Sequence, residues 1–307
     1  MSHQKWCEAA VTAEANAQAK MAERAAWMHT PRRDQNTFFN HASAATFQVA
    51  MLLAPYYPCF WTLEKKPSVR EVFDGGKWLC GLPELDTTSR ACVVYSLGSD
   101  YDTSFEEHVS SQTSGRCEFF IYDPTLAQTR SQQALDAWRA KLPRNFHVHD
   151  TALTGGNVSS VVTGRMAAAS AATATAYNNS LPLVEAMRRN GHGTSATILK
   201  FDIEGWENEL INSVPWTASG LQFGLLLFEL HASPTLLDLP RIHAMFGLLE
   251  AAGYRLYSAE PVFGGYKGTG PRRQVIGAGQ LEVAFVHRDW SPHSGFSRPC
   301  HEPRRGS

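Results

Sequence analysis

Residues 92–109 read CVVYSLGSDYDTSFEEHV, in which a mostly apolar run is followed by a glycine turn and an amphipathic segment. The run at 92–97 predicts a buried strand, and the pattern at 104–112 predicts the helix that follows it. A strand that leads through a short glycine turn into a helix is the repeating unit of a parallel α/β sheet. This stretch therefore predicts the first strand of a Rossmann-like sheet.

Short apolar runs alternate with amphipathic segments from this stretch to residue 287. The pattern predicts further strands at 118–122, 146–149, 197–201, 222–228, 255–259 and 282–287, and further helices at 131–141, 183–190, 207–213 and 239–252. Because no helical pattern separates the last two strands, we expect them to form an antiparallel closing pair. The expected fold class is thus α/β, with a Rossmann-like sheet of seven mostly parallel strands.

The rest of the chain is expected to form an N-terminal helical extension at 1–70 and a C-terminal tail at 291–307, on either side of a domain at 71–290. Residues 8–27 are rich in good helix formers and predict a peripheral helix, and residues 46–53 fit a second one. Since no strand of the pattern falls before residue 70, we expect the extension to be dispensable for the sheet. The alanine-rich run at 167–176 predicts a surface insertion.

The charge of the chain is balanced, with 28 lysines and arginines against 29 aspartates and glutamates and a formal net charge of −1. No overall field then favours nucleic acid or an anionic membrane, so no nucleic-acid partner is indicated. Hydrophobic residues make up 43% of the chain, but no apolar run reaches the length of a membrane helix. We therefore expect a soluble globular protein, in the cytoplasm or, if a signal precedes this sequence, in the secretory lumen.

The cysteines show no CxxC pair and no metal-ligand spacing, which disfavours a zinc module or a dense disulfide scaffold. They lie at Cys7, Cys59, Cys80, Cys92, Cys117 and Cys300. Buried or free thiols are the expected state. A Cys59–Cys80 or Cys80–Cys300 disulfide is the alternative for a secretory protein.

The first two predicted strands end in residues that suit an adenosine-containing cofactor. Gly98 follows the first strand, where the missing side chain lets a ligand approach the backbone closely. Asp123 ends the second strand, a placement that suits a carboxylate bound to both ribose hydroxyls. A GxGxxG motif is absent, which disfavours a pyrophosphate cradle. The predicted cofactor-binding residues are Ser96, Gly98, Ser99, Asp123 and, as a weaker candidate for the adenine amino group, Asp150. An ordinary turn at Gly98 and loop-capping aspartates are the structural alternatives.

The fourth and fifth predicted strands end in charged residues. ILKFDIEGWE at 198–207 places Lys200, Asp202, Glu204 and Glu207 after a buried run, and FELH at 228–231 adds Glu229 and His231. Charges at such strand ends are costly to bury unless they are paired, and they border the ligand crevice of an α/β sheet. The alternatives are a Lys200–Asp202 ion pair with an acidic first helix turn, and a histidine satisfied in the core. The predicted catalytic residues are Asp202, Glu204, Glu229 and His231.

These motifs, in this order, resemble the FkbM-like methyltransferase domain of the methyltransferase-like protein 24 group. The similar stretches are DGGKWLCGL at 74–82, VVYSLGSDYDTSFEEHV at 93–109, IYDPT at 121–125, ILKFDIEGWE and FELH. The resemblance spans about 73–287 and implies a class I methyltransferase fold, S-adenosylmethionine as cofactor, and methylation of a hydroxyl oxygen. It places the donor site at Gly98 and Asp123 and the family's KxDIEG signature at Lys200 and 202–205. The single glycine in the first loop and the alanine-rich insertion depart from the family pattern.

The sequence therefore predicts an S-adenosylmethionine-dependent methyltransferase that acts on a hydroxyl of a small molecule or glycan. His231 or Asp202 is the expected base, and the same oxygen-rich set suits Mg²⁺ or another divalent metal as an alternative. Residues before 92 and the glycine-rich segment 263–279 are the expected lids. The alternatives are a catalytically inactive Rossmann-like binding protein and an NAD-type oxidoreductase, and the missing glycines disfavour the latter.

Overall fold

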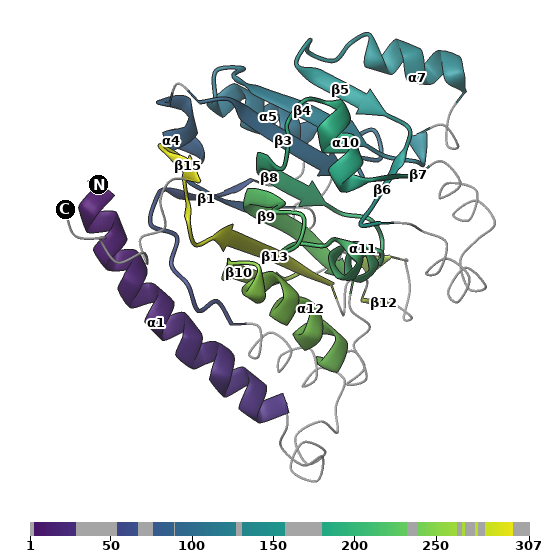
Figure 1. The fold of residues 1–307 in the computed structure, drawn as a ribbon. Coiled ribbons are helices and arrows are strands. Elements are labelled where there is room, and N and C mark those ends of the chain that lie inside the picture. Colours follow the sequence, from purple (N-terminus) through teal and green to yellow (C-terminus); the bar gives the residue numbers. More distant parts are fainter. Residues whose placement is uncertain are drawn as a thin grey trace.

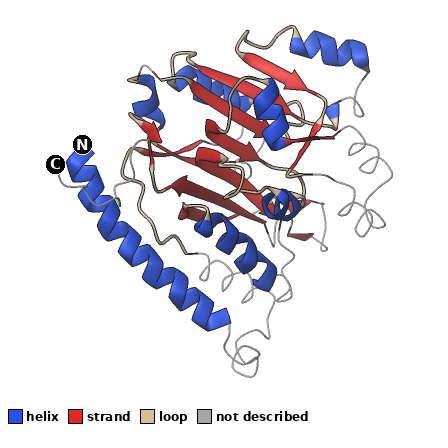
Figure 2. Cartoon of the chain, viewed as in Figure 1, coloured by secondary structure: helices blue, strands red, loops and turns tan. Residues whose placement is uncertain are grey.

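A computed structural model describes residues 3–28, 54–66, 76–88, 90–126, 131–156, 180–231, 239–262, 266–267, 274–275 and 280–296. Its centre is a seven-stranded sheet with the strand order β10-β13-β9-β8-β3-β4-β5, and helices flank this sheet (Figures 1 and 2). The strands are β3 (Cys92–Leu97), β4 (Cys117–Tyr122), β5 (Phe146–His149), β8 (Ser195–Phe201), β9 (Gln222–His231), β10 (Tyr254–Pro261) and β13 (Gln280–His287).

Strand β13 runs antiparallel to both β9 and β10, whereas β5, β4, β3, β8 and β9 are parallel to one another. This arrangement confirms the predicted Rossmann-like α/β sheet with an antiparallel closing pair. Strand β9 is longer than predicted, because its last residues Glu229, Leu230 and His231 pair with β13. Glu229 and His231, the two predicted catalytic residues on β9, therefore lie on a strand of the sheet.

Alternate residues of the strands point to opposite faces of the sheet, and each face has its own core. Val93, Tyr95 and Leu97 of β3 pack in the cluster that includes α10 (Leu183–Arg189), α11 (Glu207–Ser213) and α12 (Leu239–Ala251). Cys92 and Val94 pack in the other cluster, with α5 (Ser104–Gln112) and α4 (Leu82–Asp86). The helix α7 (Gln132–Arg139) follows β4. The helices after residue 100 thus lie within two residues of their predicted bounds.

The N-terminal part of the chain is more closely joined to the sheet than predicted. It contains α1 (His3–Met28), β1 (Leu63–Lys66) and β2 (Lys77–Cys80), and β1 pairs antiparallel with β2. No strand of the seven-stranded sheet lies in the described residues before 70, but β1, a short polar strand that the sequence pattern did not predict, forms a separate two-stranded sheet with β2. Ala13 and Ala17 of α1 are buried in the same cluster as α5.

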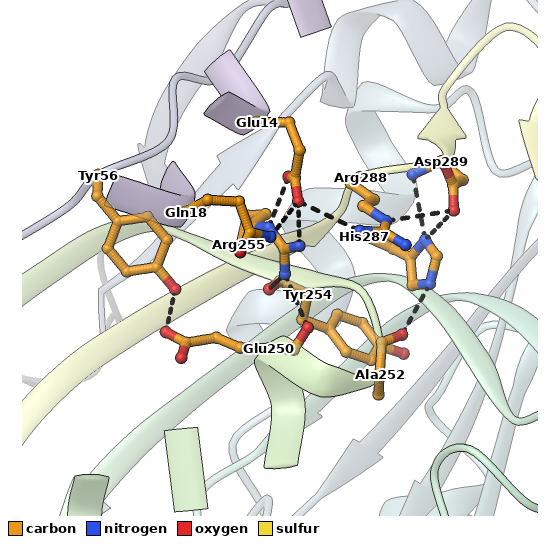
Figure 3. Close-up of polar contacts among 10 residues, drawn as sticks. All are labelled: Glu14, Gln18, Tyr56, Glu250, Ala252, Tyr254, Arg255, His287, Arg288 and Asp289. Carbon is orange, nitrogen blue, oxygen red and sulfur yellow. Dashed lines mark hydrogen bonds and ion pairs between the residues drawn. The ribbon is translucent and has the colours of Figure 1, made fainter. Parts of the chain in front are cut away.

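A buried polar network fastens α1 to the end of the sheet (Figure 3). Arg255 on β10 is 1% exposed and donates from Nε to Glu14 Oε2 at 2.7 Å. Its Nη1 donates to the carbonyl oxygens of Glu250 and Tyr254 at 2.8 and 2.7 Å. Arg288 Nη1 lies 3.2 Å from the same carboxylate. A buried guanidinium group without a partner is costly, so the contacts with Glu14 favour the state in which α1 is packed against the sheet.

Disulfides replace the expected thiols. Cys59–Cys80 joins the segment before β1 to β2, and Cys92–Cys117 joins the first residues of β3 and β4. Cys7 is also disulfide-bonded, and no cysteine among the described residues is free. The expectation of free or buried thiols was wrong, and the Cys59–Cys80 alternative is confirmed. The second bridge could not be predicted because it depends on the register of β3 against β4.

Smaller elements complete the described chain. They are β6 (Ala152–Thr154) with β7 (Ser180–Pro182), β11 (Tyr266–Lys267) with β12 (Gln274–Val275), and β14 (Trp290–Ser291) with β15 (Gly295–Phe296). The predicted helix at 46–53, the alanine-rich run at 167–176 and most of the expected lid at 263–279 lie outside the described residues. Among the helices that the structure describes, none has the length and apolar character needed to cross a bilayer.

Candidate functional site

The loop after β3 meets the end of β8 at Gly98. Gly98 has a φ of 74°, and a Cβ built on it would lie 1.8 Å from the backbone oxygen of Asp202. Asp202 N donates to Leu97 O at 3.0 Å, which holds the two chain segments together. Only glycine fits this position, because the backbone conformation and the close approach both exclude a side chain. Gly98 thus joins the predicted donor loop to the predicted catalytic segment.

Asp123 organises the same loop from the end of β4. Its Oδ2 accepts hydrogen bonds from Ser99 N at 3.0 Å and Asp100 N at 2.7 Å. Its Oδ1 accepts from Thr125 N at 2.9 Å and Thr125 Oγ1 at 2.7 Å, and the residue is 2% exposed. A carboxylate has about four acceptor positions, so a ribose hydroxyl would have to displace one of these donors. The ribose role of Asp123 stays a prediction.

The other predicted cofactor residues lie in three different environments. Ser96 is fully buried and donates from its hydroxyl to Glu106, whose pKa burial raises. Ser99 is 5% exposed, and its Oγ has no hydrogen-bond partner within the described part of the chain. Asp150 follows the edge strand β5 and lies 3.8 Å from Arg139 Nη2. Ser99 therefore offers a buried hydroxyl beside Gly98.

The four predicted catalytic residues come together around His231, the last residue of β9. His231 Nε2 lies 3.4 Å from Glu204 Oε2 and 3.5 Å from Glu229 Oε1. The side chain of Asp202 is hydrogen-bonded to that of Glu229. Neighbouring parallel strands end at one edge of the sheet, which explains why the ends of β8 and β9 supply one cluster.

Glu207 is a member of this cluster that the predicted catalytic set omitted. Its Oε1 lies 3.0 Å from His231 Nδ1 and accepts from Ile203 N at 3.1 Å and Gly205 N at 3.2 Å. Glu207 is 1% exposed. It begins α11. The sequence placed Glu207 among the strand-end charges of this segment, with an acidic first helix turn as the structural alternative. The spacing alone did not show that its carboxylate turns back toward β9.

Lys77 of β2 was also missed. It is 2% exposed, and its Nζ lies 2.6 Å from Glu282 Oε1 and 3.7 Å from Asp202 Oδ2. Burial alone would lower the pKa of Lys77, but Glu282 and Asp202 raise it above its usual value. Lys200 does not form the close pair with Asp202 that was considered, since its Nζ donates to Gly98 O at 2.7 Å.

Burial and the neighbouring charges separate the pKa values within the cluster. Burial alone would raise the pKa of Asp202, but Lys77 and Lys200 hold it below its usual value. Burial, with the charges of Asp202 and Glu282, raises the pKa of Glu229 to about 9. Burial alone would lower the pKa of His231, but Glu207 and Glu229 raise it to about 9. A cluster of titratable groups whose pKa values are shifted in opposite directions is typical of a functional site.

Asp202, Glu207 and His231 each offer one metal-ligating atom, and these atoms all lie within 4.8 Å of one another. The geometry thus suits acid–base chemistry, a bound cation, or both. Carboxylate and imidazole ligands are common to divalent metal sites.

The family described as a methyltransferase domain matches residues 13–268, which is most of the chain and begins within α1. No curated protein matches the sequence. Among solved structures, precorrin-6y C5,15-methyltransferase of Geobacter metallireducens is 12% identical, with a TM-score of 0.34 and with 67% of this chain and 84% of that chain covered. The fibrillarin pre-rRNA processing protein of Methanococcus jannaschii is 9% identical, with a TM-score of 0.32 and coverages of 65% and 67%. TrmK of M. capricolum in complex with S-adenosyl-homocysteine is 6% identical, with a TM-score of 0.32 and coverages of 67% and 67%.

Proposed function

Because this chain belongs to the methyltransferase domain family, we propose that it transfers the methyl group of S-adenosylmethionine to a hydroxyl oxygen of a small molecule or glycan. The observation that supports this proposal is the cluster of Asp202, Glu229 and His231, which shares a backbone contact with the glycine loop after β3. A donor site and a proton-accepting site are thus adjacent. The resemblance to the FkbM-like domain supports a hydroxyl as the acceptor.

The residues after β3 suit a donor without phosphate groups. S-adenosylmethionine supplies an activated methyl group on sulfur when it is bound. Gly98 lets the loop pack directly against the backbone of Asp202, and the buried Ser99 hydroxyl has no hydrogen-bond partner among the described residues. Ser96 and Asp123 stabilise the loop through Glu106 and the Ser99 and Asp100 amides. Their direct contact with the donor is part of the proposal, as is that of Asp150.

Methyl transfer to a hydroxyl requires that the protein align the acceptor and remove its proton. The Asp202 side chain is 25% exposed and that of His231 is 15% exposed, whereas Glu229 is 4% exposed. Asp202 and His231 can therefore touch an acceptor. Because the pKa of His231 is raised to about 9, His231 is mostly protonated near neutral pH, and Asp202, whose pKa is held below its usual value, is the group that takes the proton there. Glu229 positions Asp202 through their hydrogen bond. Glu204, with a side chain 85% exposed, is placed to orient the acceptor from the rim.

The first test is donor binding, measured by calorimetric titration of the full chain with S-adenosylhomocysteine and, separately, with NAD⁺. We expect binding of the former only. Binding of NAD⁺ alone would instead support the oxidoreductase. The second test follows labelled methyl transfer into small-molecule, glycan and RNA fractions.

Asp202→Asn and His231→Ala should retain the affinity for S-adenosylhomocysteine within about threefold, while methyl transfer falls by about 10²-fold or more, because a positioned general base contributes about 10²–10⁴. Glu185→Gln, an exposed variant on α10 outside the site, is the control. Wild-type rates in both site variants would rule out these residues as the base. Donor binding without transfer to any fraction would favour the inactive binding protein.

The two described disulfides indicate the redox environment in which the protein folds. Disulfides persist in oxidising environments and are rare in the cytosol. We propose that the protein matures in the secretory lumen or outside the cell, and not in the cytoplasm. Mass spectrometry of the protein from its native source, with thiols alkylated before reduction, should show Cys92 and Cys117 linked; alkylated thiols at both positions would contradict this.

A further inference from the structure

We propose that Asp202, Glu207 and His231 form a binding site for one divalent transition-metal ion, Mn²⁺ or Zn²⁺. This inference deepens the proposed function but rests on different observations. The three residues come from the ends of β8 and β9 and the start of α11, and their ligating atoms lie within 4.8 Å of one another. The set differs from the oxygen-rich set expected from the sequence, because Glu207 takes part whereas Glu204 and Glu229 do not.

The distances are close to those that coordination requires. Ligands at about 2.1 Å on opposite sides of an ion are about 4.2 Å apart, and adjacent ligands are about 3.0 Å apart. His231 Nδ1 and Glu207 Oε1 are already 3.0 Å apart. All three ligating atoms lie within 4.8 Å of one another, so the widest pair must close by at most about 0.6 Å for ligands on opposite sides of the ion and by at most about 1.4 Å for tetrahedral Zn²⁺. Side-chain rotations supply shifts of this size.

The backbone holds the ligands in place before any ion arrives. Glu207 Oε1 accepts hydrogen bonds from the amides of Ile203 and Gly205, and the backbone of Asp202 is held by the hydrogen bond that its N–H donates to Leu97 O. The connecting residues Glu204 and Gly205 have φ values of 54° and 96°, so the chain turns tightly between the two carboxylates. Supporting contacts of this kind orient metal ligands and sustain affinity.

The balance of charge favours a cation at this point. His231 faces the carboxylates of Glu204, Glu207 and Glu229 within 3.5 Å. The nearest lysines offset only part of this charge, because Lys77 Nζ lies 2.6 Å from Glu282 Oε1 and 3.7 Å from Asp202 Oδ2. Lys200 Nζ donates to the Gly98 carbonyl at 2.7 Å.

Glu282 is a further buried carboxylate near this cluster, and one of its oxygens, Oε1, lies 2.6 Å from Lys77 Nζ. It is 5% exposed, it pairs in register with Glu229, and its Oε2 has no hydrogen-bond partner among the described residues. Buried carboxylates are stable when they are paired or when they lie beside a metal ion.

The ligand types narrow the choice of ion. Mg²⁺ and Ca²⁺ prefer sites made only of oxygen, whereas imidazole nitrogen suits Zn²⁺ and related transition metals, and carboxylates suit Mn²⁺. One nitrogen and two carboxylates leave further coordination positions for solvent or acceptor oxygens. An ion there would polarise an acceptor hydroxyl and ease the loss of its proton.

The test is Mn²⁺ binding by the chelator-treated full chain, without donor or acceptor, followed by calorimetry and by the electron paramagnetic resonance of free Mn²⁺. Zn²⁺ and Mg²⁺ are titrated in parallel. We expect one ion per chain and an affinity for Mn²⁺ or Zn²⁺ at least about tenfold above that for Mg²⁺. Asp202→Asn, Glu207→Gln and His231→Gln should each weaken binding by about tenfold or more.

Glu207→Gln is the most informative variant, because the amide oxygen still accepts from the Ile203 and Gly205 amides while the charge is lost. Glu204→Gln is the matched control, since it removes an exposed carboxylate that lies 3.4 Å from His231 and should change the affinity by less than about threefold. Unchanged affinity in Glu207→Gln, equal affinity for all three ions, or no binding would overturn the inference. S-adenosylhomocysteine titrated into chelated protein reports on the proposed function separately, so either idea can fail alone.

Discussion

Replacing Glu14 with glutamine tests whether α1 is part of the stable fold or a dispensable extension. Glu14 and Arg255 are 241 residues apart in sequence, yet their side chains are paired and buried (Figure 3). Glutamine keeps the size of the side chain and removes its charge. Arg255 would then be a buried cation that has lost its carboxylate partner, which is a strongly destabilising state.

The size of the loss follows from the pKa of Glu14. Burial alone would raise this pKa, but hydrogen bonds from Arg255 and Gln18 lower it from 4.5 to about 2. A difference of about 2.5 units corresponds to about 3.4 kcal/mol, and removing one partner of a buried pair costs about 3–5 kcal/mol. Arg255 keeps two backbone carbonyls as acceptors, so we expect a loss of about 3 kcal/mol.

The pH dependence gives a second signature of the same pair. The pKa of Glu14 is lower in the folded chain than in the unfolded chain, where it is near 4.5. The stability that the pair contributes is therefore fully present above the unfolded pKa and is lost as the pH falls through about 2. The difference between wild type and Glu14→Gln should shrink over that range.

The assay is the free energy of unfolding from urea titration at pH 7 and at several acidic values. Lys20→Gln is the matched control on the same helix, because Lys20 and Glu23 pair with side chains 63% and 70% exposed and contribute about 0.5 kcal/mol or less. Adding Arg255→Met to Glu14→Gln should recover part of the loss. A loss no larger than in Lys20→Gln, or a difference that does not change with pH, would refute the reasoning.

Three further predictions concern the loop, a disulfide and a buried histidine. Gly98→Ala should destabilise the chain by about 2 kcal/mol or more and weaken S-adenosylhomocysteine binding. The control Gly115→Ala, with a φ of 71° and open space around it, should cost only about 1 kcal/mol. Equal melting temperatures for the two variants would contradict this prediction. Serine at both Cys92 and Cys117, which are 25 residues apart, should cost about 3.5 kcal/mol, and an unchanged urea midpoint would show that the bridge contributes nothing. Burial lowers the pKa of His287 from 6.5 to about 4. The free energy of unfolding should therefore be at its full value above pH 6.5 and fall by about 3 kcal/mol as the pH drops through 4. His287→Gln should lack this loss when unfolding by urea is followed at several pH values, and an acid profile identical to that of the wild type would show that His287 is not the group responsible.

The sheet could be predicted closely because its pattern is local. Buried parallel strands read as short apolar runs, and the crossover helices between them read as amphipathic segments. The ends of β8 and β9 carry charged residues that differ from those apolar runs, so Asp202, Glu204, Glu229 and His231 could be named as candidates from the sequence. Their contact around His231 follows from the sheet order, because parallel neighbours end at the same edge.

Residues whose roles depend on distant contacts could not be predicted. Lys77 lies on a four-residue strand, and its partner Glu282 is 205 residues away. Glu207 looks like an ordinary helix start until the turn at Glu204 and Gly205 directs its carboxylate to His231.

The sequence by itself determined the order of strands and helices, the glycine after β3 and the charged ends of β8 and β9. Only the tertiary structure decided which charges pair, which cysteines bond and how α1 joins the sheet. Periodicity and propensity are set by neighbouring residues, whereas these contacts depend on the register and packing of segments that are far apart in the chain.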